Sequence, residues 1–167
     1  MIRVATAEDF SSIWPIFAAI AEAGDTLAFG PGVTLEQARA YWMGSLGCAY
    51  VALRQGAIVG SYYLRPNQPG LGDHVGNAGF IVSPDARGRG IGRAMGEHCL
   101  REARAMGYLA MQFNFVVSTN ERAVALWKSL GFAVVATVPR SFRHREHGHV
   151  ATYVMHQFLD DQSSDLT

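Results

Sequence analysis

Hydrophobic residues recur along this chain with two different periods, and these periods divide it into helices and strands. Apolar residues from Phe10 to Ile20 return at helical spacing and predict a first helix. Thr34 and Gln37 form a capping box, so a second helix is expected to begin there and to carry apolar residues as far as Leu46. Runs rich in β-branched and aromatic residues predict strands over residues 1–5, 49–54, 57–65, 76–83, 109–117, 133–138 and 150–157.

Two further helices are expected in the second half of the chain. One follows a glycine-rich loop, carries apolar residues at four-residue intervals from Ile91 to Ala103, and stops near Gly107. The other begins at Asn120, a good N-cap residue, and ends at Gly131. The order of elements predicts a single α/β domain over residues 1–160, followed by a polar tail over residues 161–167.

Composition agrees with one domain, because 167 residues with 49% hydrophobic content can build a substantial core. The formal net charge is zero and there is no lysine-rich block, so we expect neither a nucleic-acid nor a membrane partner. The N-terminal residues lack the apolar stretch of a signal peptide, which predicts a cytoplasmic protein. Cys48 and Cys99 form no C-x-x-C pair and are expected to be free thiols.

The loop before the third helix reads Arg-Gly-Arg-Gly-Ile-Gly-Arg over residues 87–93. Glycines on alternate positions leave room for backbone N–H groups to point at one anion, and the helix behind them adds its positive end. A dinucleotide fingerprint does not fit, since Arg93 stands where its last glycine belongs, and no Gly-Lys-Ser/Thr follows to make a P-loop. We therefore predict a phosphate cradle formed by Arg87, Gly88, Arg89, Gly90, Ile91, Gly92 and Arg93.

Two motifs in this order resemble a known family. R-x-x-G-x-G at Arg87, Gly90 and Gly92, followed about thirty residues later by a helix from Asn120 that ends in Gly-Phe, is similar to the GNAT superfamily of acyl-CoA-dependent N-acetyltransferases. The order of elements resembles that family over nearly the whole chain. The resemblance implies an α/β (α+β) domain with a mixed, mostly antiparallel seven-stranded sheet, flanked by about four helices, in which the fourth and fifth strands splay apart.

The resemblance also implies acetyl-CoA as cosubstrate. It places the pantetheine arm beside Phe80, Ile81 and Val82, the pyrophosphate on the glycine loop, and Asn120 and Trp127 against the arm. Trp127 is a departure, because the family's usual acid at that position is a tyrosine, and an indole N–H is no useful proton donor. Either Ser118 or Tyr153 replaces that acid, or the thiolate leaves unassisted, since an ordinary thiol has a pKa of about 8.5.

The general base is not evident in the sequence. Many family members carry a glutamate on the fourth strand, whereas His74 and Asn77 are the candidates here. The polar segment 141–149, between the last two strands, is positioned to overhang the active site, where Arg143 and His144 would contact an acceptor's carboxylate. A solvated loop is an equal alternative. A metal site from the histidines of this segment lacks a completing carboxylate or cysteine, so no metal is predicted.

The acceptor is expected near the end of the first helix, where Glu22, Asp25 and Phe29 resemble the amine pocket of phosphinothricin and amino-acid acetyltransferases. We therefore predict acetyl transfer to the primary amine of a small molecule, such as an amino acid. Two alternatives remain open: a protein or peptide N-acetyltransferase, and an acyl-CoA-binding sensor without turnover. Many members of the family dimerise, and a homodimer is compatible with the sequence.

Overall fold

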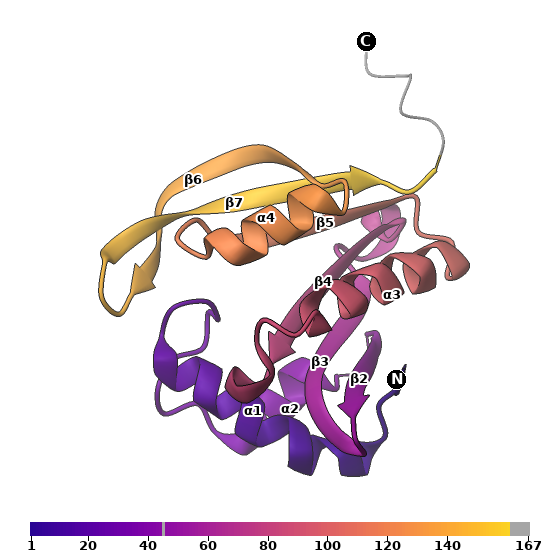
Figure 1. Cartoon of the computed structure of the whole chain (residues 1–167). Helices are drawn as coiled ribbons and strands as arrows, with labels where there is room; N and C mark the ends of the chain where they lie inside the picture. Colours follow the sequence, from indigo (N-terminus) through magenta and orange to yellow (C-terminus); the bar gives the residue numbers. More distant parts are fainter. Residues whose placement is uncertain (45, 161–167) are drawn as a thin grey trace.

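The computed structural model describes residues 1–44 and 46–160, so the tail predicted over residues 161–167 lies outside the described part (Figure 1). The order of elements follows the prediction, with three short 3-10 turns added. The helices are α1 (Phe10–Ala23), α2 (Leu35–Trp42), α3 (Ile91–Ala105) and α4 (Glu121–Ser129). The strands are β1 (Ile2–Val4), β2 (Cys48–Arg54), β3 (Ala57–Pro66), β4 (Val75–Val82), β5 (Ala110–Val117), β6 (Ala133–His144) and β7 (Gly148–Phe158).

All of these strands belong to one seven-stranded sheet in the order β1-β2-β3-β4-β5-β7-β6. The β4–β5 pair is parallel, and the other neighbouring pairs are antiparallel. This arrangement confirms the mixed, mostly antiparallel sheet implied by the family resemblance. The predicted β2–β3 hairpin turns at Gln55 and Gly56, whose φ angles of 51° and 81° are those of a tight two-residue turn.

Helices cover both faces of the sheet. Alternate residues of a strand point to opposite faces, and on β3 Tyr62 and Leu64 pack into the core beneath α3 and α4, whereas Tyr63 packs into the core of α1 and α2. Figure 1 shows α3 running across the sheet close to β4, and α4 lying beside β5. The two cores are therefore separated by the sheet itself.

The β4 and β5 strands diverge soon after they begin. Their register holds only for Val75 opposite Ala110 and Gly76 opposite Met111. A methyl group at Gly76 would lie 2.6 Å from the sulfur of Met111, so glycine permits this close approach. Beyond it, the Asn77 side chain spans the gap and donates to the Gln112 carbonyl at 2.9 Å. The fourth and fifth strands thus splay apart, as expected, and leave a wedge that widens toward the end of β4.

Two predicted boundaries were wrong. The α2 helix ends at Trp42 and does not carry Leu46, which is 78% exposed; Gly44 and Gly47 follow the helix and do not sustain it. Strands β6 and β7 are also longer than expected. Ser141, Phe142, Arg143 and His144 lie in β6, and only residues 145–147 form the turn, so segment 141–149 is mainly a paired hairpin and not a loop. A shift in register between Val138 and Phe142 accommodates Pro139 and lets the strand continue beyond residue 138.

Candidate functional site

A cavity of about 260 Å³ occupies the wedge between β4 and β5. Its walls come from both sides of the sheet. Phe29, Tyr41 and Tyr63 line it on the α1/α2 side, whereas Asn120 and Trp127 line it on the α3/α4 side. Because β4 and β5 are paired only at their beginnings, the cavity is lined by residues from both faces of the sheet.

The glycine loop lies before α3 on the α3/α4 side. Gly88 and Gly90 have φ angles of 74° and 78°, in the left-handed region that glycine adopts without strain. Within residues 1–44 and 46–160, no hydrogen-bond acceptor takes the backbone N–H groups of residues 88–93. These groups precede a helix of 15 residues, so its positive end adds to them. The loop therefore has the backbone geometry of a phosphate cradle.

The loop's arginines differ in what they contact. Arg87 and Arg89 are exposed beside the cradle. Arg93 donates to the Ser129 hydroxyl of α4 at 2.8 Å and lies 3.7 Å from the Glu97 carboxylate. Arg93 thus links the start of α3 to the end of α4. Its guanidinium would interact with an anion on the loop while it keeps these contacts.

The free edge of β4 faces the gap. The His74 carbonyl accepts from the Leu109 N–H at 2.9 Å, which directs its backbone groups toward β5. Because this direction alternates along a strand, the N–H and C=O groups of Ala78, Phe80 and Val82 also face the gap. The side chain of Ile81 is buried in the α1/α2 core. Of the residues predicted beside the pantetheine, Phe80 and Val82 thus present an open backbone edge, and Ile81 turns away.

Aromatic rings fill the α3/α4 side of the wedge. Trp127 packs against Phe80 of β4 and Phe113 of β5, with ring centroids 4.7 and 4.9 Å away. A methyl group at Gly96 would meet Trp127 at 3.1 Å, so α3 approaches α4 closely here. Asn120 caps α4, and its Oδ1 accepts from the Ala123 N–H at 3.3 Å, which leaves its Nδ2 as the group able to donate to a ligand in the cavity.

The α1/α2 side of the wedge carries a chain of hydroxyl and amide groups. The Tyr41 and Tyr63 hydroxyls lie 3.1 Å apart, and the Tyr63 hydroxyl lies 3.5 Å from Asn77 Oδ1. Burial raises the pKa of Tyr63, so this phenol stays protonated at neutral pH. None of the described residues lining this cavity is an aspartate, a glutamate or a histidine. The cavity therefore offers hydrogen bonds but no strong base.

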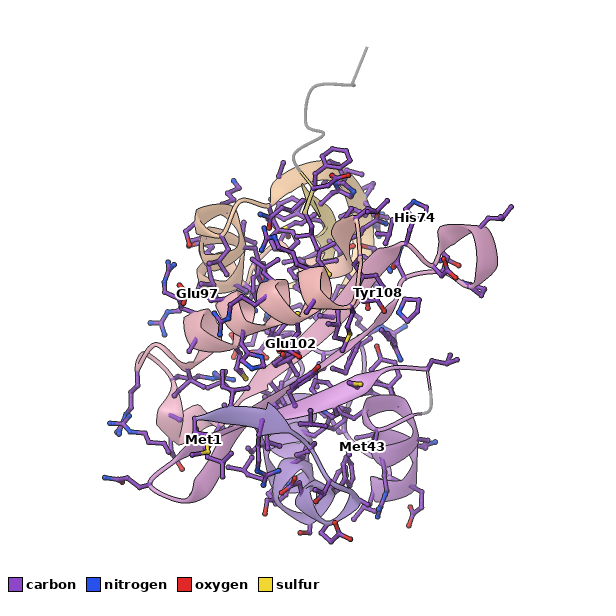
Figure 2. The ribbon with its side chains drawn as sticks, turned by 90° about the vertical axis from the view of Figure 1, so that its right-hand side faces the viewer. Met1, Met43, His74, Glu97, Glu102 and Tyr108 are labelled. Atoms are coloured by element: carbon purple, nitrogen blue, oxygen red, sulfur yellow. The ribbon has the colours of Figure 1, made fainter. Side chains whose placement is uncertain are left out.

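The structure separates the predicted acid and base candidates. Asn77 lines the cavity, whereas His74, Ser118 and Tyr153 are not among its lining residues. His74 is exposed, and Figure 2 shows it on the same side as Tyr108, at the opposite end of α3 from Glu97. That is the closed end of the wedge, where β4 and β5 are still paired.

A second cavity, of about 710 Å³, adjoins the first where Leu27, Ala28, Phe29 and Phe115 line both. It lies between the segment after α1 and the β6–β7 hairpin. Four of the residues predicted to bind the acceptor substrate line it: Glu22, Phe29, Arg143 and His144. Asp25 does not line it, and the Oδ1 atom of Asp25 is buried without a hydrogen-bond partner among the described residues.

The hairpin turn is fastened over this second cavity. The Arg145 N–H donates to the Gly24 carbonyl at 3.0 Å, and its guanidinium donates to the Glu22 carbonyl at 2.9 Å. The buried His144 accepts at Nδ1 from the N–H groups of Glu146 and His147, at 3.1 and 3.2 Å. Since Nδ1 is an acceptor, the neutral ring carries its proton on Nε2 and acts as a donor.

Several residues of the site were missed in the sequence. Arg65, Tyr41 and Asn114 line the first cavity, and Arg65 and Tyr63 share a face of β3 with Asn77 of β4. The signal was present as the polar-tipped residues Tyr63 and Arg65, two positions apart on β3, on the face that also carries Ser61. Asn114 is directed into the site by a register shift in β5 between Phe113 and Val116, which no local pattern announces.

The described part of the chain offers neither a metal-binding cluster nor a membrane-spanning helix. No group of three or more histidine, cysteine, aspartate or glutamate side chains is placed there to hold a metal ion. None of its helices combines the length and the apolar character that crossing a bilayer requires.

Comparison with known proteins gives consistent matches. The N-acetyltransferase aca1 of Schizosaccharomyces pombe is 35% identical over 99 residues, which are 59% of this chain and 47% of that protein. A ribosomal protein bS18-alanine N-acetyltransferase of Salmonella typhimurium is 35% identical over 76 residues, 46% of this chain and 50% of that protein. The chain thus spans about half the length of these curated relatives.

Solved structures match over more of the chain. A GCN5-related N-acetyltransferase from Kribbella flavida has a TM-score of 0.90 and 45% identity, and the match covers 95% of this chain and 96% of that one. A phosphinothricin acetyltransferase from Sinorhizobium meliloti, solved with acetyl-CoA, has a TM-score of 0.83 but 22% identity over 95% and 87% of the two chains, so it shows a shared fold alone. Because the profile of the acetyltransferase (GNAT) family matches residues 13–132, most of its length, the chain belongs to that family, which uses acetyl-CoA.

Proposed function

We propose that this protein transfers the acetyl group of acetyl-CoA to a primary amine of a small molecule. The observation that carries the proposal is the cavity between β4 and β5, whose walls belong to both faces of the sheet. A cosubstrate on the α3/α4 side and an acceptor on the α1/α2 side would meet in that gap.

The residues on the α3/α4 side fit acetyl-CoA. The free N–H groups of residues 88–93 suit its pyrophosphate, and the open backbone edge at Ala78, Phe80 and Val82 suits the amides of the pantetheine arm, which would pair as an added strand does. Charge-assisted hydrogen bonds contribute about 1.5–3 kcal/mol each before ordering costs. Four of them are compatible with micromolar binding, which corresponds to roughly −8 kcal/mol.

The bound thioester supplies an activated acetyl group, and the chain orients the amine that attacks it. The new N–C bond replaces the C–S bond, the thiolate departs with the electrons of that bond, and the nitrogen gives its remaining extra proton to water or to the thiolate. Trp127 has no acidic proton to offer, but a thiol with a pKa of about 8.5 is a tolerable anion at neutral pH. Since the first cavity contains no carboxylate or histidine among its described lining residues, the amine must lose its proton to water before it attacks. Tyr63 and Asn77 then orient it by hydrogen bonds.

The second cavity favours a small acceptor. Its volume of about 710 Å³ is within the usual range for small-molecule sites. The hairpin turn is hydrogen bonded to the end of α1 through Arg145, which closes the cavity on that side. A polypeptide would need an open groove there.

Acetylation of a protein N-terminus is the second candidate. It is favoured by two relatives described as ribosomal-protein-alanine N-acetyltransferases, one from Salmonella typhimurium at 35% identity over 76 residues and one from Brucella melitensis with a TM-score of 0.84 and 25% identity. A peptide acceptor requires the Arg145 contacts to open, whereas a small amine does not.

The test is thiol release from acetyl-CoA with pooled amino acids, polyamines, aminoglycosides and short peptides, after subtraction of acceptor-free hydrolysis. We expect the signal in the amino-acid pool. A signal confined to peptides would favour the second candidate. Acetyl-CoA binding without transfer to any pool would refute both and support a sensor.

A further inference from the structure

Arg65 is held between two aromatic rings in the wall of the first cavity. Its Cζ lies 4.3 Å from the centroid of the Tyr63 ring and 4.7 Å from that of Tyr41. The two rings meet edge to face, with centroids 5.6 Å apart. The two rings therefore contact the half-buried guanidinium from two directions and hold it at the end of β3.

No carboxylate among the described residues neutralises this charge. The ion pairs among residues 1–44 and 46–160 are Arg3 with Asp9 and Arg93 with Glu97. Cation–π contacts stabilise a guanidinium without neutralising its charge, so the N–H groups that do not face the rings can donate to an anion. A planar donor set of that kind matches a carboxylate or phosphate geometrically, and it lies in the wall of a cavity.

Two of the three fully charged side chains that line the neighbouring cavity are positive. Arg143 and Arg145 line it, and the buried His144 presents a donor. Glu22 is the one carboxylate among the described residues that line either cavity, and it is exposed at the end of α1. The acceptor side therefore attracts an anion and does not favour a molecule that is only cationic, such as a polyamine.

The position of Arg65 suits a short molecule. Arg65 is paired across β3 and β4 with Asn77, and Tyr63 is paired with Gly79, on the same face of the sheet. These two pairs are about 7 Å apart, since a strand rises by about 3.3 Å per residue. An anion bound to Arg65 would thus lie about 7 Å, one residue pair along the sheet, from the Tyr63–Gly79 pair beside the gap in which the amine must react.

We infer that Arg65 binds a carboxylate of the acceptor, so that the acceptor is a small amino acid. The inference rests on the proposed function. Arg65 is then a specificity-determining residue, and Arg143 and His144, in the second cavity, face the outer part of the acceptor.

The experiment compares amino acids with their carboxamides, which keep the amine and the side chain but remove the charge. Steady-state kcat/KM is measured for both series with the wild type, Arg65→Met and Arg65→Lys. We expect the wild type to prefer the acids at least about tenfold, a preference that Arg65→Met abolishes by slowing the acids alone. Arg65→Lys should restore it only in part, because lysine lacks the planar fork.

Arg39→Met is the matched control. Arg39 also lies over an aromatic ring, at 5.8 Å from Phe10, but it lines neither cavity of the site. It should leave both series unchanged. Thermal melts and acetyl-CoA titrations of each variant show whether folding and the cosubstrate site are intact.

Binding separates failure of this inference from failure of the proposed function. Titration of tyrosine and tryptophan fluorescence with an acid and its amide, in the presence of CoA, requires no turnover. Tighter binding of the acid to the wild type, lost in Arg65→Met, supports the inference even if no acceptor is acetylated, a result that would overturn the proposed function alone. Equal binding of acid and amide, equal loss of both in Arg65→Met, or activity confined to peptides would overturn the role of Arg65.

Discussion

Replacing Gly90 with alanine tests whether the backbone of the glycine loop binds the cosubstrate. Gly90 precedes α3 with a φ angle of 78°, and a Cβ atom there would meet nothing within 4 Å. The substitution therefore adds no clash and no charge. It acts only through the backbone, because alanine disfavours the left-handed conformation that directs the N–H groups of residues 88–93 outward.

The expected loss of affinity has two limits. If the free loop relaxes and must be returned to its left-handed form on binding, the cost is about 1 kcal/mol. If the loop cannot return, the bonds from about two N–H groups are lost, which costs roughly 3 kcal/mol net. Since 1.4 kcal/mol corresponds to about tenfold in Kd, the dissociation constant for acetyl-CoA should rise by about 5- to 150-fold.

Gly56→Ala is the control. Gly56 has nearly the same φ angle, 81°, and a methyl group there would also meet no atom within 4 Å, but it lies in the β2–β3 turn and lines neither cavity. Urea unfolding should show a similar loss of stability in both variants, about 1–2 kcal/mol. Calorimetric titration with acetyl-CoA should show weakened binding for Gly90→Ala alone. If Gly90→Ala loses stability but binds as the wild type does, the loop is not the anion cradle.

Three further predictions concern the core, acid stability and the missing base. Ser61→Ala should lower the free energy of unfolding, measured in urea, by about 2–4 kcal/mol, because the buried Ser61 hydroxyl accepts from Trp42 Nε1 at 2.8 Å and donates to a β2 carbonyl at 2.7 Å. Ser11→Ala, at an exposed position, should cost far less. Equal losses in the two variants would contradict this interpretation. Asp9 forms two bonds with Arg3, at 2.6 and 2.9 Å, and its pKa is lowered from 3.8 to about 2, chiefly by that hydrogen bonding. A carboxyl group whose pKa is lowered in the folded state stabilises the protein above about pH 4, and this stabilisation is lost as the pH falls to about 2. Asp9→Asn should therefore cost about 1 kcal/mol of stability at neutral pH, allowing for solvent screening, and nothing near pH 2. A loss of stability that does not depend on pH would be inconsistent with the ion pair. Finally, kcat/KM for an accepted amine should rise about tenfold per pH unit up to the pKa of the amine itself, and a plateau near pH 7 would reveal a base that the cavity does not show.

The backbone geometry of the glycine loop could be predicted from sequence because its information is local. A loop with glycine at alternate positions and a helix behind it dictates its own backbone geometry over residues 87–93, whatever lies elsewhere in the chain. The cap at Asn120 is equally local. The divergence of β4 and β5 is a property of the whole sheet, and it was expected from the family resemblance and not from any residue in those strands.

The acceptor half could not be predicted in the same way, because its residues meet only through long-range packing. Arg65, Tyr41 and Asn114 come from β3, α2 and β5, and each is an ordinary residue within its own element. His74 was a candidate base because many family members carry a glutamate on the fourth strand. The position of a residue along that strand does not tell at which end of the wedge the residue lies. The β6 strand was expected to end at residue 138, but it continues to His144 because a register shift in its pairing with β7 accommodates Pro139.

The missing base and the role of Arg65 lead to the same acceptor. In a cleft without a base, the rate depends on the fraction of free amine, which at pH 7 is about 10% for an amino group of pKa about 8 but only about 0.04% for a lysine side chain of pKa about 10.4. A free amino acid is at a disadvantage in water, since its carboxylate raises the pKa of the neighbouring ammonium. The proposed pairing of that carboxylate with Arg65, beside the low-dielectric rings of Tyr41 and Tyr63, would remove the disadvantage and lower the pKa of the amine. If Arg65 binds the carboxylate as we propose, binding would help to deprotonate the group that must react, and a cleft whose described lining residues include no carboxylate or histidine would then suit an α-amino acid.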